Sequence, residues 1–109
     1  MANTFKLKTK ANVGVTTVGI YTAPASTTTV VIGITLANTS GSGVNVGVGI
    51  TRAGATEDVK LLKNAPIPQG SSLEVMQGNK IVVEAADTVT AKSDVNNTLD
   101  VALTIMEIT

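Results

Sequence analysis

The chain has 109 residues, 43% of them hydrophobic but only 2% aromatic, with 8 basic and 8 acidic side chains and no His, Cys or Trp. Without cysteine it can form neither disulfides nor thiolate metal sites, and a formal net charge of zero creates no strong field for nucleic acid or an anionic membrane. The lack of His and Cys also removes the side chains most used in catalysis, so we expect no enzymatic activity, no metal and no cofactor.

Short segments rich in Val, Ile and Thr follow one another along the chain, separated by turns rich in Gly, Pro and Ser. Such spacing is typical of an all-β domain. No window has a sustained helical period. The expected strands cover residues 4–10, 18–21, 28–36, 44–51, 59–63, 73–76, 80–84, 88–93 and 99–108. The fold class is therefore all-β: a single-domain antiparallel β-sandwich over residues 1–109, with either jelly-roll or Ig-like strand order.

Two strands show the clearest alternation. In residues 28–36, the side chains predicted to share one face are Val30, Ile32, Ile34 and Leu36. In residues 99–108, those of the core face are Leu99, Val101, Leu103 and Ile105. Met106 and Ile108 switch faces near the end of that strand, which indicates either a bulge or a second contact surface.

Turn signals separate the later strands. Residues 66–70 predict a rigid bend because two prolines bracket Ile67. Residues 77–79 predict a hairpin turn, and residues 85–87 predict a tight turn. Phe5 and Tyr21 are the only aromatic residues, and we expect Phe5 to belong to the core.

Lys6, Lys8 and Lys10 line one face of the first expected strand, opposite Phe5 and Leu7. Residues 1–12 form either an extended N-terminal arm or an edge strand. The lysines are candidates for docking onto an acidic surface. Alternatively, they are a solvated face, or charges that keep an edge strand from pairing wrongly.

Gly47 and Gly49 share a strand face opposite a row of valines. Glycine inside a strand marks either the close approach of another backbone or a bulge, so these two residues are candidates for contact with a neighbouring subunit. Ile67 is a further candidate contact if its side chain is exposed. No serine, carboxylate pair or Asp-rich loop has the spacing of a catalytic or calcium site.

Five segments resemble small virion structural proteins of tailed marine phages, including cyanophages. They are MANTFK at residues 1–6, VVIGITLANT at 30–39, KNAPIPQGSSL at 63–73, KIVVEAADTV at 80–89 and LDVALTIMEI at 99–108. Many members of that family have Gly where this chain has Ala86, which leaves the conformation of that turn open.

The resemblance implies a non-enzymatic bacteriophage virion protein, made in the host cytoplasm. The favoured role is a capsid decoration or cement protein that binds the outer shell as a multimer. A neck or tail component that attaches a fibre is the alternative, and a host-surface binding module is ranked low. The implied partners are the major capsid protein or neck and tail proteins of the same particle. Self-association is also expected, because a core this poor in aromatics gains burial from contact with other copies.

Overall fold

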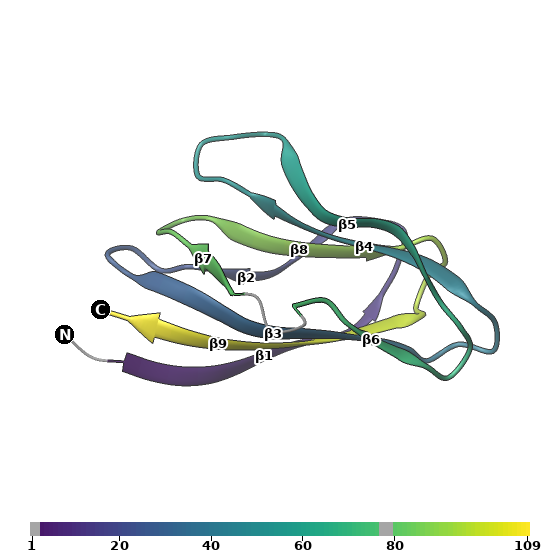
Figure 1. The fold of residues 1–109 in the computed structure, drawn as a ribbon. Helices are drawn as coiled ribbons and strands as arrows, with labels where there is room; N and C mark the ends of the chain where they lie inside the picture. Colours follow the sequence, from purple (N-terminus) through teal and green to yellow (C-terminus); the bar gives the residue numbers. More distant parts are fainter. Residues whose placement is uncertain (1–2, 77–79) are drawn as a thin grey trace.

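The computed structural model describes residues 3–76 and 80–109, and in this part of the chain it consists of two antiparallel β-sheets packed face to face (Figure 1). The predicted all-β sandwich is confirmed. The strands are β1 (Asn3–Val13), β2 (Val18–Thr22), β3 (Thr28–Asn38), β4 (Val44–Thr51), β5 (Asp58–Ile67), β6 (Ser72–Glu74), β7 (Ile81–Val83), β8 (Thr88–Ser93) and β9 (Leu99–Ile108). The hairpin turn predicted at residues 77–79 lies outside the described residues.

The strand order is that of a jelly roll. Sheet A has the order β1-β9-β3-β6, with β7 also paired to β3, and sheet B has the order β2-β8-β4-β5. The first strand pairs with the last, and β1, β2, β3 and β4 alternate between the sheets. This resolves the choice between jelly-roll and Ig-like order, which depends on pairing between strands far apart in the chain.

The core between the sheets is almost entirely aliphatic. The largest fully buried side chains are those of Ile34, Leu36, Ile67, Leu99, Leu103, Ile105 and several valines. The predicted core face of the last strand is confirmed, since all four of its residues are buried. The prediction that Phe5 belongs to the core is wrong: its side chain is 70% exposed, because it points to the outer face of the edge strand β1.

The prediction that Val30, Ile32, Ile34 and Leu36 share one face is wrong, because β3 contains a bulge. Val31 pairs with Ile105, and Gly33 pairs with Thr104, so Ile32 is an extra residue between consecutive partners on β9. The inward face therefore carries Thr29 and Val31 before the bulge and Ile34 and Leu36 after it. Val30 is on the outer face, because one inserted residue exchanges the two faces of everything that precedes it.

Pro66 lies inside β5, where the sequence predicts a bend. The strand runs to Ile67, and Pro66 pairs opposite Asn45. An edge strand of sheet B tolerates proline, because the missing N–H is not needed by a further neighbour.

Candidate interaction surfaces

The lysines of β1 lie along an edge of sheet A. Residues 3–10 pair one by one with β9, so this segment is an edge strand rather than a separate arm. Lys6, Lys8 and Lys10 pair with Ile105, Leu103 and Val101, which places them on the inward side of the sheet at its open edge. Lys6 Nζ lies 2.8 Å from Glu107 Oε1, so the first of these lysines already has a partner within the chain.

That ion pair belongs to a buried polar cluster that joins the two sheets. The Tyr21 hydroxyl, from sheet B, donates to Glu107 Oε2 at 2.6 Å and lies 2.8 Å from Thr29 Oγ1. Hydrogen bonds from Lys6 and Tyr21 outweigh desolvation and lower the pKa of Glu107 below its ordinary value. Burial, together with the neighbouring carboxylate, raises the pKa of Tyr21 to about 12. The cluster holds a charged group at one end of an otherwise aliphatic core.

Gly47 and Gly49 approach the chain's own strand β5. A Cβ on Gly49 would lie 2.5 Å from Asp58 Oδ2 and 2.7 Å from the Val59 carbonyl oxygen, and Gly49 is buried. A Cβ on Gly47 would lie 3.2 Å from the Leu62 carbonyl oxygen. Close backbone approach therefore occurs here, but its partner is intramolecular. Gly49 is not accessible to a neighbouring subunit, which corrects the interpretation of this residue.

Ile67 cannot contact a neighbouring protein either. Its side chain is 1% exposed and belongs to the core. The Asn38 side-chain amide donates to the Ile67 carbonyl oxygen at 3.0 Å, which fixes the end of β5 against the end of β3. The role of this segment is to connect the sheets.

The outer face of sheet A carries an apolar row that sequence reasoning missed. Phe5 pairs with Met106, Met106 with Val30, and Val30 with Val82, so these four side chains are cross-strand neighbours on one face. Phe5 and Val82 are 70% and 57% exposed, and Leu7, two residues along β1 from Phe5, is 64% exposed. The sequence feature that could have revealed the row is the change of face at Met106. The row is consistent with the second of the two interpretations given for it, a second contact surface.

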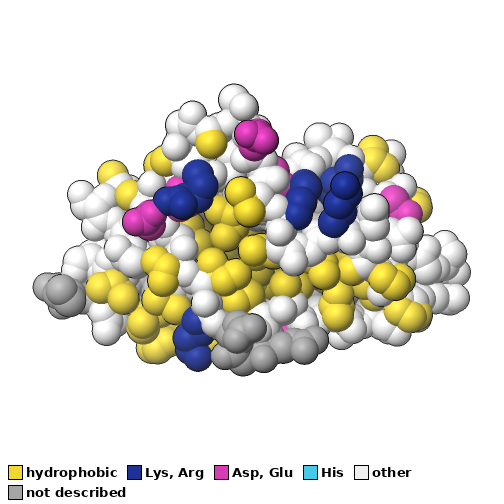
Figure 2. Space-filling model, turned by 45° about the horizontal axis from the view of Figure 1, so that its top comes forward, with side chains coloured by type: hydrophobic (Ala, Val, Ile, Leu, Met, Phe, Trp, Pro, Cys, Tyr) yellow, Lys and Arg dark blue, Asp and Glu magenta, His cyan; other side chains and the backbone are white. Residues whose placement is uncertain are grey.

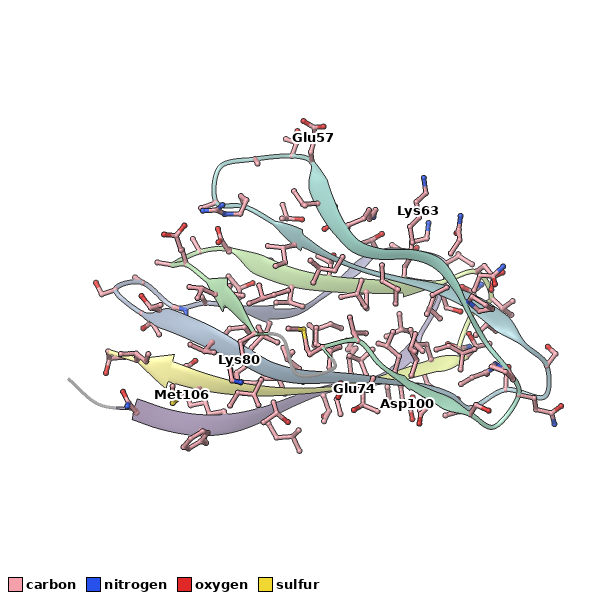
Figure 3. All side chains as sticks on the ribbon, in the orientation of Figure 1. Glu57, Lys63, Glu74, Lys80, Asp100 and Met106 are labelled. Atoms are coloured by element: carbon pink, nitrogen blue, oxygen red, sulfur yellow. The ribbon has the colours of Figure 1, made fainter. Side chains whose placement is uncertain are left out.

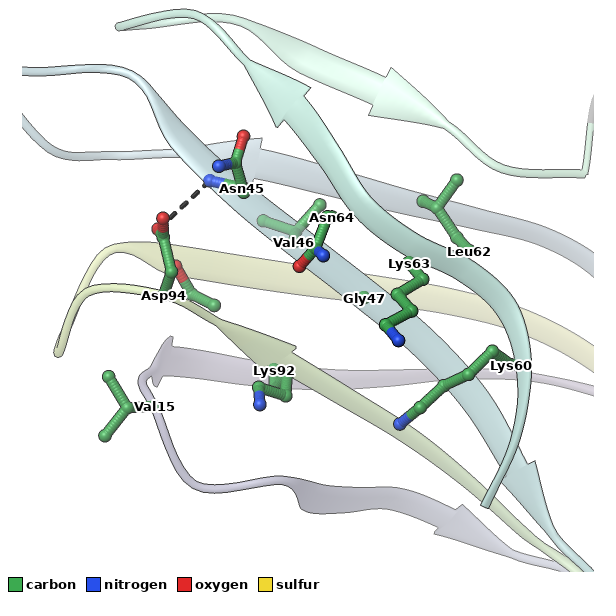
Figure 4. Close-up of a pocket in the computed structure, with 11 residues that line it drawn as sticks. Val15, Asn45, Val46, Gly47, Lys60, Leu62, Lys63, Asn64, Lys92 and Asp94 are labelled. Atoms are coloured by element: carbon green, nitrogen blue, oxygen red, sulfur yellow. Dashed lines mark hydrogen bonds between the residues drawn. The ribbon is translucent and has the colours of Figure 1, made fainter.

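Sheet B has the opposite character. A groove of about 320 Å³ on its outer face is lined by three lysines, Lys60, Lys63 and Lys92, with Gly47 among its other lining residues (Figure 4). We call this the basic groove. Asp94 also lines it and accepts the Asn45 backbone N–H at 3.0 Å. Figure 2 shows Lys and Arg side chains in two separate groups on the upper part of this face, with hydrophobic side chains between and below them.

Among the described residues, neither the apolar row nor the basic groove contains a metal-binding cluster. Within residues 3–76 and 80–109, no group of three or more His, Cys, Asp or Glu side chains could hold a metal ion. In the same residues, no helix is long and apolar enough to cross a membrane. The outer faces of the two sheets differ in polarity: sheet A carries apolar side chains and sheet B carries ammonium groups.

Comparisons with known proteins show similarity in structure but not in sequence. No family model and no curated protein matches the chain. A Bacillus endospore appendage protein, from disulfide-linked pili, has a TM-score of 0.53 at 20% identity, over 96% of this chain and 85% of that chain. A protein of the IBDV viral particle has a TM-score of 0.59 at 11% identity, over 96% of this chain and 30% of that chain.

A third structure is the capsid of the Helicobacter pylori bacteriophage KHP30. It has a TM-score of 0.55 at 11% identity, over 100% of this chain and 94% of that chain. At such identities the likeness establishes the fold alone. The structural neighbours thus include a phage capsid protein, a second viral capsid protein and a pilus protein. Unlike those disulfide-linked pili, this chain contains no cysteine.

Proposed function

We propose that this chain is a non-enzymatic structural protein of a bacteriophage virion, and that it is a capsid decoration protein. The observation that carries the proposal is the apolar row on the outer face of sheet A. Monomeric proteins seldom leave bulky apolar side chains side by side on a flat sheet face, and patches of this kind mark interaction sites. Phe5 is the one phenylalanine of the chain, and its ring stands 70% exposed in the row.

In this proposal the outer faces of sheet A and sheet B have different roles. The apolar row packs against the shell formed by the major capsid protein, and the lysine-bearing face of sheet B points away from it. Burying three or four such side chains supplies most of the contact energy, since each contributes about 1.5–3 kcal/mol when fully buried. Repetition over many equivalent sites then multiplies a modest affinity.

The shared jelly-roll fold supports an assembly role, because two of the three neighbours described above are virus particle proteins. A neck or tail protein would use the same fold and the same apolar row. The two roles differ in copy number and in location on the particle, which one binding experiment separates.

The experiment adds purified protein to particles assembled without it, sediments the particles and counts the bound copies. Decoration predicts saturable binding in many copies per shell, with loss of binding in Phe5→Ser. Val95→Ser is the matched control, because Val95 is 46% exposed outside the apolar row. Binding in a few copies per particle would indicate a neck or tail position, and no binding would contradict the proposal.

A further inference from the structure

We propose that the basic groove of sheet B accepts Glu57 of a second copy of this chain. The inference goes beyond the proposed function, because it concerns a contact between two copies of this chain in solution. It concerns a different surface from the apolar row, so the two can be tested separately.

Two bulges in β5 build the groove. Val46 pairs with Ala65 and Val48 with Leu62, which leaves one extra residue on β5 opposite Gly47. A second register shift follows between Leu62 and Lys60. In a regular strand, residues three apart point to opposite faces, whereas here Lys60 and Lys63 both line the groove. Bulges that redirect side chains are frequent at functional sites.

The neighbouring residues leave room for a ligand. Gly47 has no side chain to fill the space, and Lys92 is its cross-strand partner on β8. Asn64 has a φ of 53°, in the left-handed region, at the bulge that carries Lys63. Figure 4 shows Lys60, Lys63 and Lys92 extending toward the same side of the sheet.

The groove retains excess positive charge. Lys60 Nζ lies 2.7 Å from Asp58 Oδ2 and is therefore partly neutralised. Lys63 and Lys92 take part in no ion pair among the residues that the structure describes. The groove thus suits a carboxylate. Asp94, which lines the groove, and Asp58, the ion-pair partner of Lys60, disfavour a polyanion such as nucleic acid, because each would repel its phosphates.

The chain presents a matching carboxylate. Glu57 is exposed at the end of the connection between β4 and β5, and it points away from the body of the protein (Figure 3). It forms no ion pair with any other described residue. Ala53, Gly54, Ala55 and Thr56 precede it, so a single carboxylate is offered on a small, uncharged loop.

Glu57 and Lys63 both project from the side of the molecule where β5 lies (Figure 3). Two copies that turn this side toward each other can therefore exchange the contact reciprocally, as a two-fold axis requires. Each exposed ion pair is individually weak and screened by salt. We therefore expect an association that is visible at high protein concentration and low ionic strength.

The test uses sedimentation velocity on the full chain and two charge reversals, Glu57→Lys and Lys63→Glu. Each variant alone should remain monomeric under conditions where the wild type associates. An equal mixture of the two should associate again, because the ammonium group introduced in one variant then meets the carboxylate introduced in the other, while the second pair keeps its native charges. Lys80→Glu, an exposed lysine outside the groove, is the control and should associate like the wild type.

Association of either single variant at the wild-type level would overturn the inference, and so would a mixture that stays monomeric. A wild-type chain that is monomeric yet binds particles refutes this contact and leaves the proposed function standing. A chain that associates through Glu57 and Lys63 but binds no particle refutes the proposed function instead. Identical far-UV spectra and melting temperatures establish that both variants are folded.

Discussion

Ala86 has a backbone conformation that is unfavourable for a residue with a side chain. Its φ is 69°, and its N–H donates to the Ala23 carbonyl oxygen at 2.8 Å in the turn before β8. A residue with a Cβ is strained in this left-handed region. The turn is thus of the kind that favours glycine, although the chain places alanine there.

Replacing this residue by glycine should therefore stabilise the protein. We expect Ala86→Gly to raise the free energy of unfolding by about 0.5–1 kcal/mol, the relief of strain exceeding the added entropy of the unfolded chain. Urea unfolding measures the change. Ala102→Gly is the control, because Ala102 lies within β9 and has no positive φ, so glycine there should destabilise. An unchanged or lower stability of Ala86→Gly would show that the turn is not strained.

Glu107 makes the stability depend on pH. Its pKa in the folded state is lowered from the ordinary 4.5 by Lys6 and Tyr21, so the carboxylate stabilises the fold above that value. The contribution is lost as the pH falls through the folded-state pKa. Glu107→Gln should reduce the free energy of unfolding by about 1–3 kcal/mol at pH 7 and by less at pH 3.

Urea midpoints of wild type and variant between pH 3 and 7 measure this difference. Glu57→Gln serves as control, since that side chain is exposed and should change the midpoint little at any pH. A Glu107→Gln variant whose deficit stays constant with pH would contradict the assigned role of the carboxylate.

At the scale of elements, the close contact between β4 and β5 is fixed by Gly49. A methyl group there would meet both the Asp58 carboxylate and the Val59 carbonyl oxygen, and Asp58 is itself held by Thr90 Oγ1 at 2.7 Å. Gly49→Ala should therefore cost about 1–3 kcal/mol, as other overpacking substitutions do. Thermal unfolding measures the loss. Gly41→Ala is the matched control, because nothing lies within 4 Å of the position its Cβ would take.

An unchanged melting temperature of Gly49→Ala would mean that β5 can move away at little cost. In that case Gly49 would not set the spacing of the two strands.

Strand existence was predictable at this scale, because alternation and turn residues are local properties of the sequence. Which side chains share a face of a strand was less predictable. Ile32 forms a bulge that exchanges the two sides of β3, and no local pattern distinguishes a bulged Ile from a paired one. Phe5 alternates correctly with the lysines, but only the pairing of β1 with β9 decides that the lysine face is inward and that the ring lies on the outer face.

The candidate surfaces were also only partly predictable from the sequence. Gly49 and Ile67 were reasonable contacts from sequence, and both are covered by the chain itself. The apolar row joins β1, β9, β3 and β7, and the basic groove joins β4, β5 and β8. Such surfaces depend on the strand order, which periodicity does not contain.

For the whole molecule, stability and assembly should be separable. Phe5→Ser removes an exposed side chain, so its effect on the free energy of unfolding should stay within about 0.5 kcal/mol. Binding to particles should nevertheless be lost, because the largest apolar group of the proposed contact is gone. Comparing melting temperatures with particle-bound fractions tests both halves of this prediction. A variant that binds as well as the wild type would remove Phe5 from the contact.

The proposed function is tested most directly by cryo-electron microscopy of phage particles assembled in the presence of this chain. We predict jelly-roll density in many copies on the capsid lattice, with Phe5 and Met106 facing the shell and Lys63 away from it. Density confined to the neck or tail would contradict decoration. Copies whose sheet A faces solvent would show that the apolar row is not the surface that binds the shell.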